Sequence, residues 1–161
     1  MAIQDFSHSV PMMLYRALDA VMPPFRCIFT AAGLTEQQWR VLRVLWEHEE
    51  IAQGALAGLA LIPAPSLIGV LDRLTINGLI ERHRSPDDRR VVNVAATRAG
   101  RRLAEKLMPA VANVYATLRA SLDNRTWTQL EFALQSLSGA PPPIRRKKRG
   151  LRARVSGASH E

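Results

Sequence analysis

The sequence has little that would support covalent cross-links, metal binding or catalysis. A single cysteine, Cys27, excludes an intramolecular disulfide and favours a reducing compartment. The four histidines, at positions 8, 48, 83 and 160, are spaced too widely to predict a zinc site. The sequence contains no phosphate-binding glycine loop, dinucleotide-binding motif or nucleophile elbow. We therefore expect no cofactor, no metal and no enzymatic activity.

Signals for secretion or membrane insertion are also weak. The N-terminal stretch lacks the basic and apolar regions of a secretory signal, so we expect a cytoplasmic protein. Residues 51–71 run for 21 positions without a charge, which is long enough to span a bilayer. That segment contains Gln53, Ser66, three glycines and two prolines. It fits two short amphipathic helices joined by a turn better than a membrane span.

Positive charge is what the chain has in excess, and it is concentrated in two places. The net charge of +8 suggests a polyanionic partner such as nucleic acid or an acidic membrane surface. Residues 145–154 hold seven basic residues and no acidic one, and residues 81–102 hold seven basic against three acidic. We expect residues 145–161 to form a disordered basic tail. The tail either adds nonspecific affinity for phosphates or has no specific role.

The spacing of apolar residues predicts a mainly α fold with a small β-hairpin wing. One helical region is expected over residues 9–32, begun by Ser9 and interrupted at Pro23-Pro24. A second helical region is expected over 98–138, with caps at Thr97 and at a Thr126–Gln129 capping box. Between them, a winged helix-turn-helix is expected over about residues 35–96. The whole forms one domain over residues 1–144.

The elements of that central region are predicted as follows. A Thr35 capping box starts a helix over 36–47, and short helices follow over 53–59 and from Pro65 to Asn77-Gly78. Strands over 79–84 and 91–95 enclose a turn of charged and turn-forming residues.

This order of elements suits DNA. A second helix can place side chains against base edges in the major groove, while a hairpin beside it carries a cation into the narrow minor groove. Arg89 and Arg90 fall at the expected hairpin tip. Asp87 or Asp88 could hold one of their guanidinium groups in a bidentate pair.

Several short motifs then carry a family resemblance. They are LTEQQWRVLR (34–43), PSL (65–67), LDRL (71–74), GLIER (78–82), DRR (88–90) and TRAG (97–100). In order and spacing they resemble the MarR family of bacterial transcription regulators over about residues 8–138. The LTEQQWR stretch is similar to the HpaR-like subgroup, which regulates homoprotocatechuate and other aromatic-acid catabolism. The resemblance implies an obligate homodimer, built by the N- and C-terminal helices, on a palindromic operator. It also implies repression that a small aromatic acid relieves.

The candidate DNA-binding residues follow from both lines of reasoning. Within the motif of the wing, the resemblance implies that Arg90 enters the minor groove beside Asp88. On the second helix, Ile68 could contact a thymine methyl group and Gly69 could allow close approach. The full set is Gln53, Ser66, Ile68, Gly69, Arg73, Arg82, Arg84, Asp88, Arg89 and Arg90.

Each assignment has a plainer alternative. Arg73 could pair with Asp72 or Glu81, Ser66 could bond nearby backbone, and the basic residues of the wing could simply be solvated. A nonspecific nucleic-acid-binding protein that relies on its tail is the alternative for the chain as a whole.

An aromatic-acid effector requires an arginine for its carboxylate and an apolar wall for its ring, which indicates the candidate effector-binding residues. The resemblance places this pocket between the dimer helices and the DNA-binding region. His8 and Ser9, at the start of the first helix, could reach it across the dimer. The set is His8, Ser9, Arg16, Phe25, Trp39, Arg40 and Arg43. Trp39 could instead be plain core, and Arg16 could pair with Asp19 or an acidic residue of the partner. A thiol-based redox sensor is a further alternative, although we expect Cys27 to be buried among its apolar neighbours.

Overall fold

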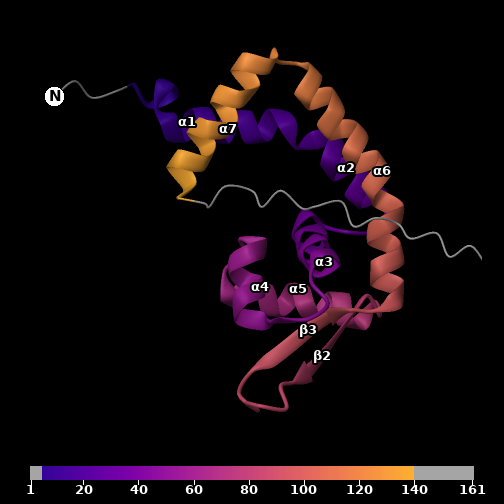
Figure 1. Ribbon diagram of the computed structural model, residues 1–161. Helices are drawn as coiled ribbons and strands as arrows, with labels where there is room; N and C mark the ends of the chain where they lie inside the picture. Colours follow the sequence, from indigo (N-terminus) through magenta and orange to yellow (C-terminus); the bar gives the residue numbers. More distant parts are fainter. Residues whose placement is uncertain (1–4, 140–161) are drawn as a thin grey trace, which may run out of the picture. The chain divides into compact units, whose positions relative to one another are not determined.

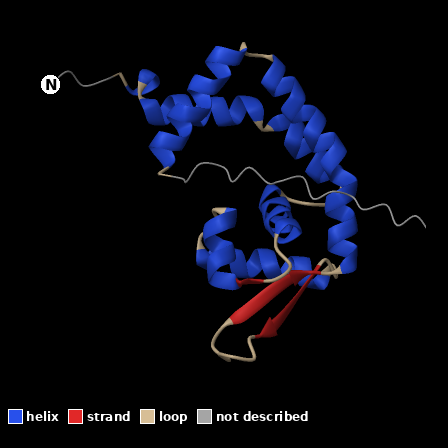
Figure 2. Cartoon of the chain, in the orientation of Figure 1, coloured by secondary structure: helices blue, strands red, loops and turns tan. Residues whose placement is uncertain are grey.

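The computed structural model describes residues 5–139, which form two compact units, one ending at Ser121 and the other beginning at Leu122. The predicted basic tail over 145–161 lies outside the described residues. In chain order the elements are η1 (Phe6–His8), α1 (Val10–Val21), α2 (Pro23–Ala31), α3 (Glu36–Glu47), β1 (Ile51–Ala52), α4 (Gln53–Ala60), α5 (Ala64–Ile76), β2 (Ile80–Arg84), β3 (Val92–Ala96), α6 (Arg98–Ala120) and α7 (Asn124–Ser138) (Figure 1). Helices dominate and the strands form one small sheet (Figure 2), which confirms the predicted fold class.

Most helix starts follow their local signals. The Thr35 hydroxyl accepts from the Gln38 N–H, and the Gln38 side chain accepts from the Thr35 N–H, so the predicted capping box at α3 is present. The Thr97 hydroxyl likewise accepts from the N–H of Gly100 at the start of α6. The interruption at Pro23-Pro24 is a break between two helices, because these prolines occupy the first turn of α2.

Two predicted caps differ in the structure. The helix predicted to open at Thr126 begins earlier, because the Asp123 carboxylate accepts from the N–H groups of both Arg125 and Thr126. Thr126 therefore lies inside the first turn of α7. Ser9 does occupy the N-cap position of α1, but its hydroxyl donates to the Phe6 carbonyl and caps no amide of the helix.

Helix α3 is the centre of the unit that contains the winged helix. It packs against α4 and α5 on one side and against α6 on another (Figure 1). Its apolar stripe is buried with leucines from α4 and α5, and each fully buried leucine stabilises the fold by about 1.5–3 kcal/mol. The large side chains with almost no exposure are Leu42, Leu45, Leu56, Leu67, Leu71, Leu74, Val41 and Val94.

The wing is a three-stranded antiparallel sheet in the order β1-β3-β2, and not the two-stranded hairpin that the sequence predicts. Residue Val94 lies in the middle of β3, opposite Arg82 on one side and Ile51 on the other. Strand β1 has only two residues, too few to show alternation in the sequence. Through β1, the segment between α3 and α4 holds the base of the wing.

The junction between the wing and α6 leaves no room for a side chain. The Thr97 N–H donates to the Leu79 carbonyl at 3.1 Å, and the Thr97 hydroxyl donates to the Gly78 carbonyl at 2.7 Å. A Cβ built on Gly100 would lie 3.0 Å from the Leu79 carbonyl carbon and closer still to its oxygen. Gly78 itself has a φ of +66°, as predicted for the residue that ends α5.

Apolar surface remains exposed on two helices. Neither α1 nor α7 buries any residue within the described chain. The exposed apolar residues are Val10, Met13, Leu14, Tyr15 and Leu18 on α1, and Leu130, Phe132, Leu134 and Leu137 on α7. Cys27 is also exposed, so the expectation that it is buried was wrong. Phe25 and Phe29 are the buried residues of α2, one helical turn apart, and Cys27 lies between them on another face.

No single helix among the described residues has the length and hydropathy to cross a membrane. Helices α4 and α5 meet that test only as a pair, on length and composition, and they are bent by 102° where they join.

Candidate DNA-binding surface and effector pocket

Helix α5 has one buried face and one open face. Its inward face consists of Leu67, Val70, Leu71 and Leu74. The four residues proposed to contact DNA from this helix, Ser66, Ile68, Gly69 and Arg73, are all exposed. Half of the Ile68 side chain is open to solvent, and a Cβ on Gly69 would meet nothing within 4 Å. This face can therefore approach a duplex without rearrangement of the core.

The structure does not show the alternative contacts considered for Ser66 and Arg73, a bond to nearby backbone and an ion pair with Asp72 or Glu81. Within residues 5–139 the Ser66 hydroxyl has no hydrogen-bond partner, and Arg73 makes no ion pair. The carboxylate of Asp72 is taken by Arg82 of β2 instead, at 2.7 Å. Both Ser66 and Arg73 thus keep their donors available to an external partner.

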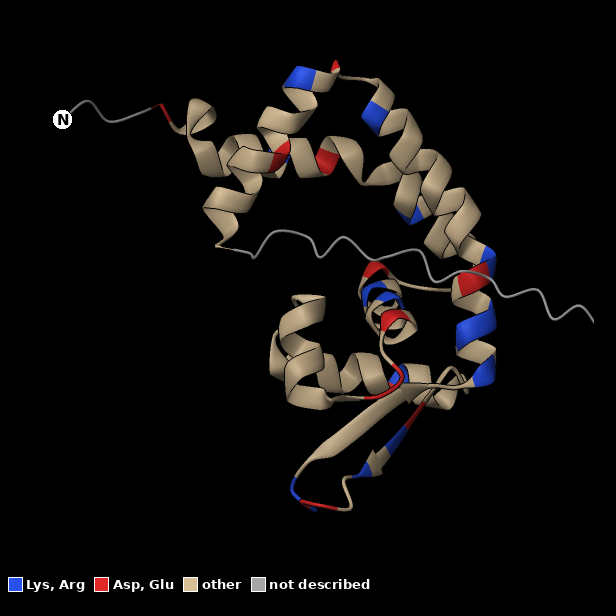
Figure 3. Cartoon of the chain, viewed as in Figure 1, with Lys and Arg blue, Asp and Glu red and all other residues tan. Residues whose placement is uncertain are grey.

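Of the four arginines of the wing that are predicted to bind DNA, two contact other residues of the protein and two have free guanidinium groups. Arg82 ties β2 to α5 through Asp72, and the Arg84 guanidinium donates to the Arg89 carbonyl across the tip. The side chains of Arg89 and Arg90 are exposed and make no hydrogen bond or ion pair among the described residues. Basic and acidic residues lie together at the tip of the hairpin (Figure 3), and its free guanidinium groups are those of Arg89 and Arg90.

The expected pairing between an aspartate and a guanidinium at the tip was wrong. The Asp88 carboxylate accepts from the backbone N–H of Arg90 at 2.9 Å. Asp87 makes no salt bridge within residues 5–139, and its own N–H donates to the Ser85 hydroxyl. Asp88 therefore shapes the turn that presents Arg90, and leaves the Arg90 side chain free.

Gln53 and Arg90 lie on the same hollow. They line a cavity of about 370 Å³ together with Ala52, Gly54 and the start of β3. Gln53 is the first residue of α4, so the unpaired N–H groups of that helix end lie there as well. A cation and a helix N-terminus that share one hollow suit a phosphate group.

A second cavity lies where α1, α2, α3, α4 and α6 converge. Its volume is about 480 Å³. Aromatic rings form much of its wall: Phe29 stacks on Trp39 at 5.1 Å between centroids, and Phe25 lies 4.9 Å from Tyr115. The complete lining is Leu18, Met22, Phe25, Phe29, Glu36, Trp39, Arg40, Arg43, Val44, Leu59, Ala60, Leu61, Val111 and Tyr115.

We call this cavity the effector pocket after the predicted effector residues that line it. Its charged side chains differ in their hydrogen-bond and ion-pair partners. Arg43 is 2.6 Å from Glu47 and lies over the ring of Trp46 at 4.9 Å. Arg40 donates one hydrogen bond, to the Leu61 carbonyl, and its Nε is buried without a partner among the described residues. Glu36 is paired with Arg26 at 3.3 Å. Arg40 is therefore the pocket arginine without an acidic partner among the described residues.

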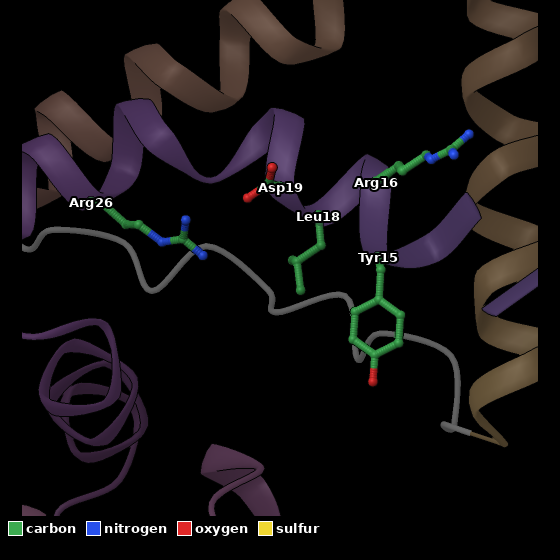
Figure 4. A pocket seen from close by; sticks show the side chains of 5 residues that line it. All are labelled: Tyr15, Arg16, Leu18, Asp19 and Arg26. Carbon is green, nitrogen blue, oxygen red and sulfur yellow. The ribbon is translucent and has the colours of Figure 1, made fainter. Parts of the chain in front are cut away.

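The structure brings four predicted effector residues together and places three elsewhere. Phe25, Trp39, Arg40 and Arg43 share the effector pocket. Arg16 lines a neighbouring cavity of about 380 Å³ with Tyr15, Leu18, Asp19 and Arg26. In that cavity Tyr15 and Leu18 extend to the same side of α1, whereas Arg16 extends away from them (Figure 4).

His8 and Ser9 line neither cavity within the chain. The His8 Nδ1 lies 3.0 Å from the Asp5 carboxylate, and this hydrogen bond is the main reason that the pKa of Asp5 is below its ordinary value.

Sequence reasoning missed Tyr115 as a pocket residue. It lies four residues after Val111, so it occurs on the inward stripe of α6 at a spacing that could have indicated it. Glu36 and Leu61 were also missed. Their place in the pocket depends on how α2 and α4 pack against α3, which no local pattern reports.

Comparisons with known proteins identify the family. The MarR family model matches residues 34–92, which cover α3, the helix-turn-helix and the wing as far as the start of β3. The transcriptional regulator FarR of Neisseria gonorrhoeae is 33% identical over 86% of this chain and 94% of its own length. The chain belongs to the MarR family. As a MarR protein it is a DNA-binding transcription regulator and not an enzyme.

Two further relatives of this MarR protein concern aromatic compounds. The homoprotocatechuate degradative operon repressor of Escherichia coli is 32% identical over 79% of this chain and 86% of that repressor. A crystal structure of NadR in complex with 4-hydroxyphenylacetate has a TM-score of 0.73 and 33% identity, and covers 88% of this chain and all of that one. The predicted resemblance to the HpaR-like subgroup is thereby confirmed.

Proposed function

We propose that this MarR protein is a repressor that binds a palindromic operator as a homodimer, and that a small aromatic carboxylate in the effector pocket releases it. The observation that carries the proposal is a pocket walled by aromatic rings that also contains Arg40. This arginine has no acidic partner among the described residues, and it donates to the Leu61 carbonyl in the turn that leads into α5. An aromatic ring can pack on such a wall while its carboxylate is held by the guanidinium. The names of the E. coli repressor and of the NadR complex support the same ligand class.

Dimerisation is supported by the exposed apolar faces of α1 and α7. Each helix presents large apolar side chains and buries none of them within the described chain. A monomer seldom leaves such faces open to water, because their burial is favourable by about 25 cal/mol per Å². Two copies of the winged helix would then read two half-sites spaced by about one helical turn, ~34–36 Å.

On DNA, each predicted group has a distinct role. Ser66, Ile68, Gly69 and Arg73 would read base edges in the major groove, and Arg90 would enter the minor groove. Gln53 and the N-terminus of α4 would hold a backbone phosphate. The ligand would favour a dimer whose half-site spacing does not match the operator, and operator affinity would fall by the differential binding free energy, ~1–3 kcal/mol.

The test is operator selection from random duplexes, followed by fluorescence anisotropy with and without 4-hydroxyphenylacetate. We expect a palindromic consensus, and a loss of affinity of about 5- to 150-fold at saturating ligand. The neutral amide, 4-hydroxyphenylacetamide, is the matched control, because it keeps the ring and loses the charge; it should have little effect.

Two outcomes would contradict the proposal. The first is selection without a palindrome combined with loss of all DNA binding when residues 145–161 are removed, which would favour the nonspecific alternative. The second is release by the acid and the amide alike, which would remove the carboxylate from the mechanism. The oligomeric state is measured separately, by analytical ultracentrifugation.

A further inference from the structure

The first two turns of α5 present mostly apolar surface to solvent. Ala64, Pro65 and Ile68 are exposed there, and half of the Ile68 side chain is open to water. Gly69 beside them adds no side chain, and a Cβ at this position would meet nothing within 4 Å. We call these four residues the apolar patch of α5. The inward residues of the same turns are buried in the core, so the apolar patch is what this end of the helix offers to a partner.

Ile68 lies at the centre of the apolar patch. Residues three and four positions apart are neighbours on one helix face, so Ile68 adjoins Pro65 and Ala64 in the preceding turn and Asp72 in the following one. The helical rise separates Ala64 from Ile68 by about 6 Å along the axis, which is close to two base-pair steps of a duplex. The patch is therefore long enough to face two neighbouring base pairs in a major groove.

The polar side chains around the apolar patch do not favour one base by hydrogen bonding. The Asp72 carboxylate is of the type that accepts from cytosine, but Arg82 Nη2 lies 2.7 Å from its Oδ1 and neutralises its charge. The Ser66 hydroxyl has no partner within residues 5–139, yet a hydroxyl both donates and accepts, so it fits several bases. Selectivity at this end of α5 must then come from the apolar patch.

Apolar contact distinguishes one base from the other three. In the major groove thymine presents a C5-methyl group, whereas adenine, guanine and cytosine are recognised there through hydrogen-bonding groups. Burial of a methyl group against an apolar side chain is favourable. A polar base edge covered by the same side chain loses its water without gaining a partner, which is unfavourable.

We propose that the apolar patch selects thymine in each operator half-site, through contact between Ile68 and the C5-methyl group. The inference rests on the proposed function, because it assumes that α5 enters the major groove. The surroundings favour DNA as the occupant: Arg73, one turn beyond Gly69 on the same face, and Arg90 of the wing keep their guanidinium groups unpaired among the described residues. Without a side chain at Gly69, the base edge can approach the helix closely enough to reach Ile68.

The experiment replaces thymidine by deoxyuridine in one half-site of the selected operator, one position at a time. Deoxyuridine pairs with adenine as thymidine does and lacks only the methyl group. Operator Kd is measured by fluorescence anisotropy on the full chain. At the contacted position we expect binding to weaken about 4-fold, which is the effect of one buried methyl group. Thymines of the half-site that Ile68 does not contact should tolerate the replacement.

Two variants connect the methyl group to its contact. Ile68→Ala should bind the thymidine and deoxyuridine operators equally, because the side chain that covers the methyl group is gone. Ile76→Ala is the matched control, since Ile76 is an isoleucine of the same helix that lies 83% exposed in its last turn. This variant should keep the 4-fold difference. Both changes remove exposed side chains, so the fold is retained.

Three results would overturn the inference: a selected half-site without thymine, a wild-type protein indifferent to every deoxyuridine replacement, or an undiminished 4-fold difference in Ile68→Ala. Weakened self-association of Ile68→Ala, with no deoxyuridine effect in the wild type, would assign the apolar patch to a protein contact instead. A wild-type protein that prefers no duplex sequence would overturn the proposed function itself.

Discussion

Replacement of Gly100 by alanine tests how the wing is joined to α6. The added Cβ would lie 3.0 Å from the Leu79 carbonyl carbon and nearer to its oxygen, where ordinary contact begins at 3.4 Å. Because the obstacle is backbone and not the end of a flexible side chain, either α6 or the start of β2 must shift. The hydrogen bond from the Thr97 N–H to the Leu79 carbonyl spans the same junction and would be strained by that shift.

The magnitude follows from three contributions. Overpacking of a close contact costs about 1–3 kcal/mol, and a weakened hydrogen bond costs about 0.5–1.5 kcal/mol. Alanine in place of a helical glycine returns about 0.5–1 kcal/mol. The net destabilisation is therefore about 2 kcal/mol, which for a chain of this size lowers Tm by roughly 4–8 °C.

The assay is thermal unfolding by circular dichroism, with Gly58→Ala as the matched control. Gly58 is also helical, but a Cβ there would meet nothing within 4 Å, so Gly58→Ala should raise stability by about 0.5–1 kcal/mol. If Gly100→Ala unfolds at the wild-type temperature or above, the close approach of α6 to Leu79 is not a constraint and the reasoning fails.

Three other predictions address the wing, α7 and the free thiol. Arg90→Ala should weaken operator binding and reduce the slope of log K against log salt by about 1 per protomer, with the dimer intact, whereas Arg125→Ala should leave both unchanged; anisotropy over a salt series measures this. Bonds from the Thr126 hydroxyl and N–H lower the pKa of Asp123 below its ordinary 3.8, so its capping of α7 should be complete above pH 3.8 and be lost as pH falls through the lower, folded pKa. NMR shifts of the Thr126 amide should report that loss, and should stay constant in Asp123→Ala. Cys27 should react with a thiol reagent in the folded protein as fast as in urea, and a large protection factor would show that its surface is covered.

Most of the fold could be predicted because its signals are local. The Thr35 and Thr97 caps and the glycine after α5 each act within one turn of chain, so the sequence alone marks them. Strand β1 could not be predicted, since Ile51 forms its sheet only by pairing with Val94, far along the chain. Local capping signals can also compete: Asp123 accepts from the Thr126 amide, which the Gln129 side chain would have bound in a box at Thr126.

The residues of the candidate site could be predicted from the sequence better than their hydrogen-bond and ion-pair partners. Composition and the family motifs indicated which arginines to choose, but not that Arg82 would be held by Asp72 or that Arg84 would close the tip. The exposure of Cys27 could have been predicted from the helical period, because Phe25 and Phe29 share a face on which residue 27 cannot lie.

The attachment of the wing has a consequence for how such regulators diversify. Strand β3 is fixed at its base by β1 and β2, while the tip closes on itself through the Ser85 N–H to the Val91 carbonyl and the Val91 N–H to the Asp88 carbonyl, both at 2.9 Å. The tip is thus a self-contained loop on a rigid stem. Loops of other lengths or charges could be grafted between residues 85 and 91 without disturbing α5. Minor-groove preference could then be exchanged between relatives, or engineered, independently of what the major-groove helix reads.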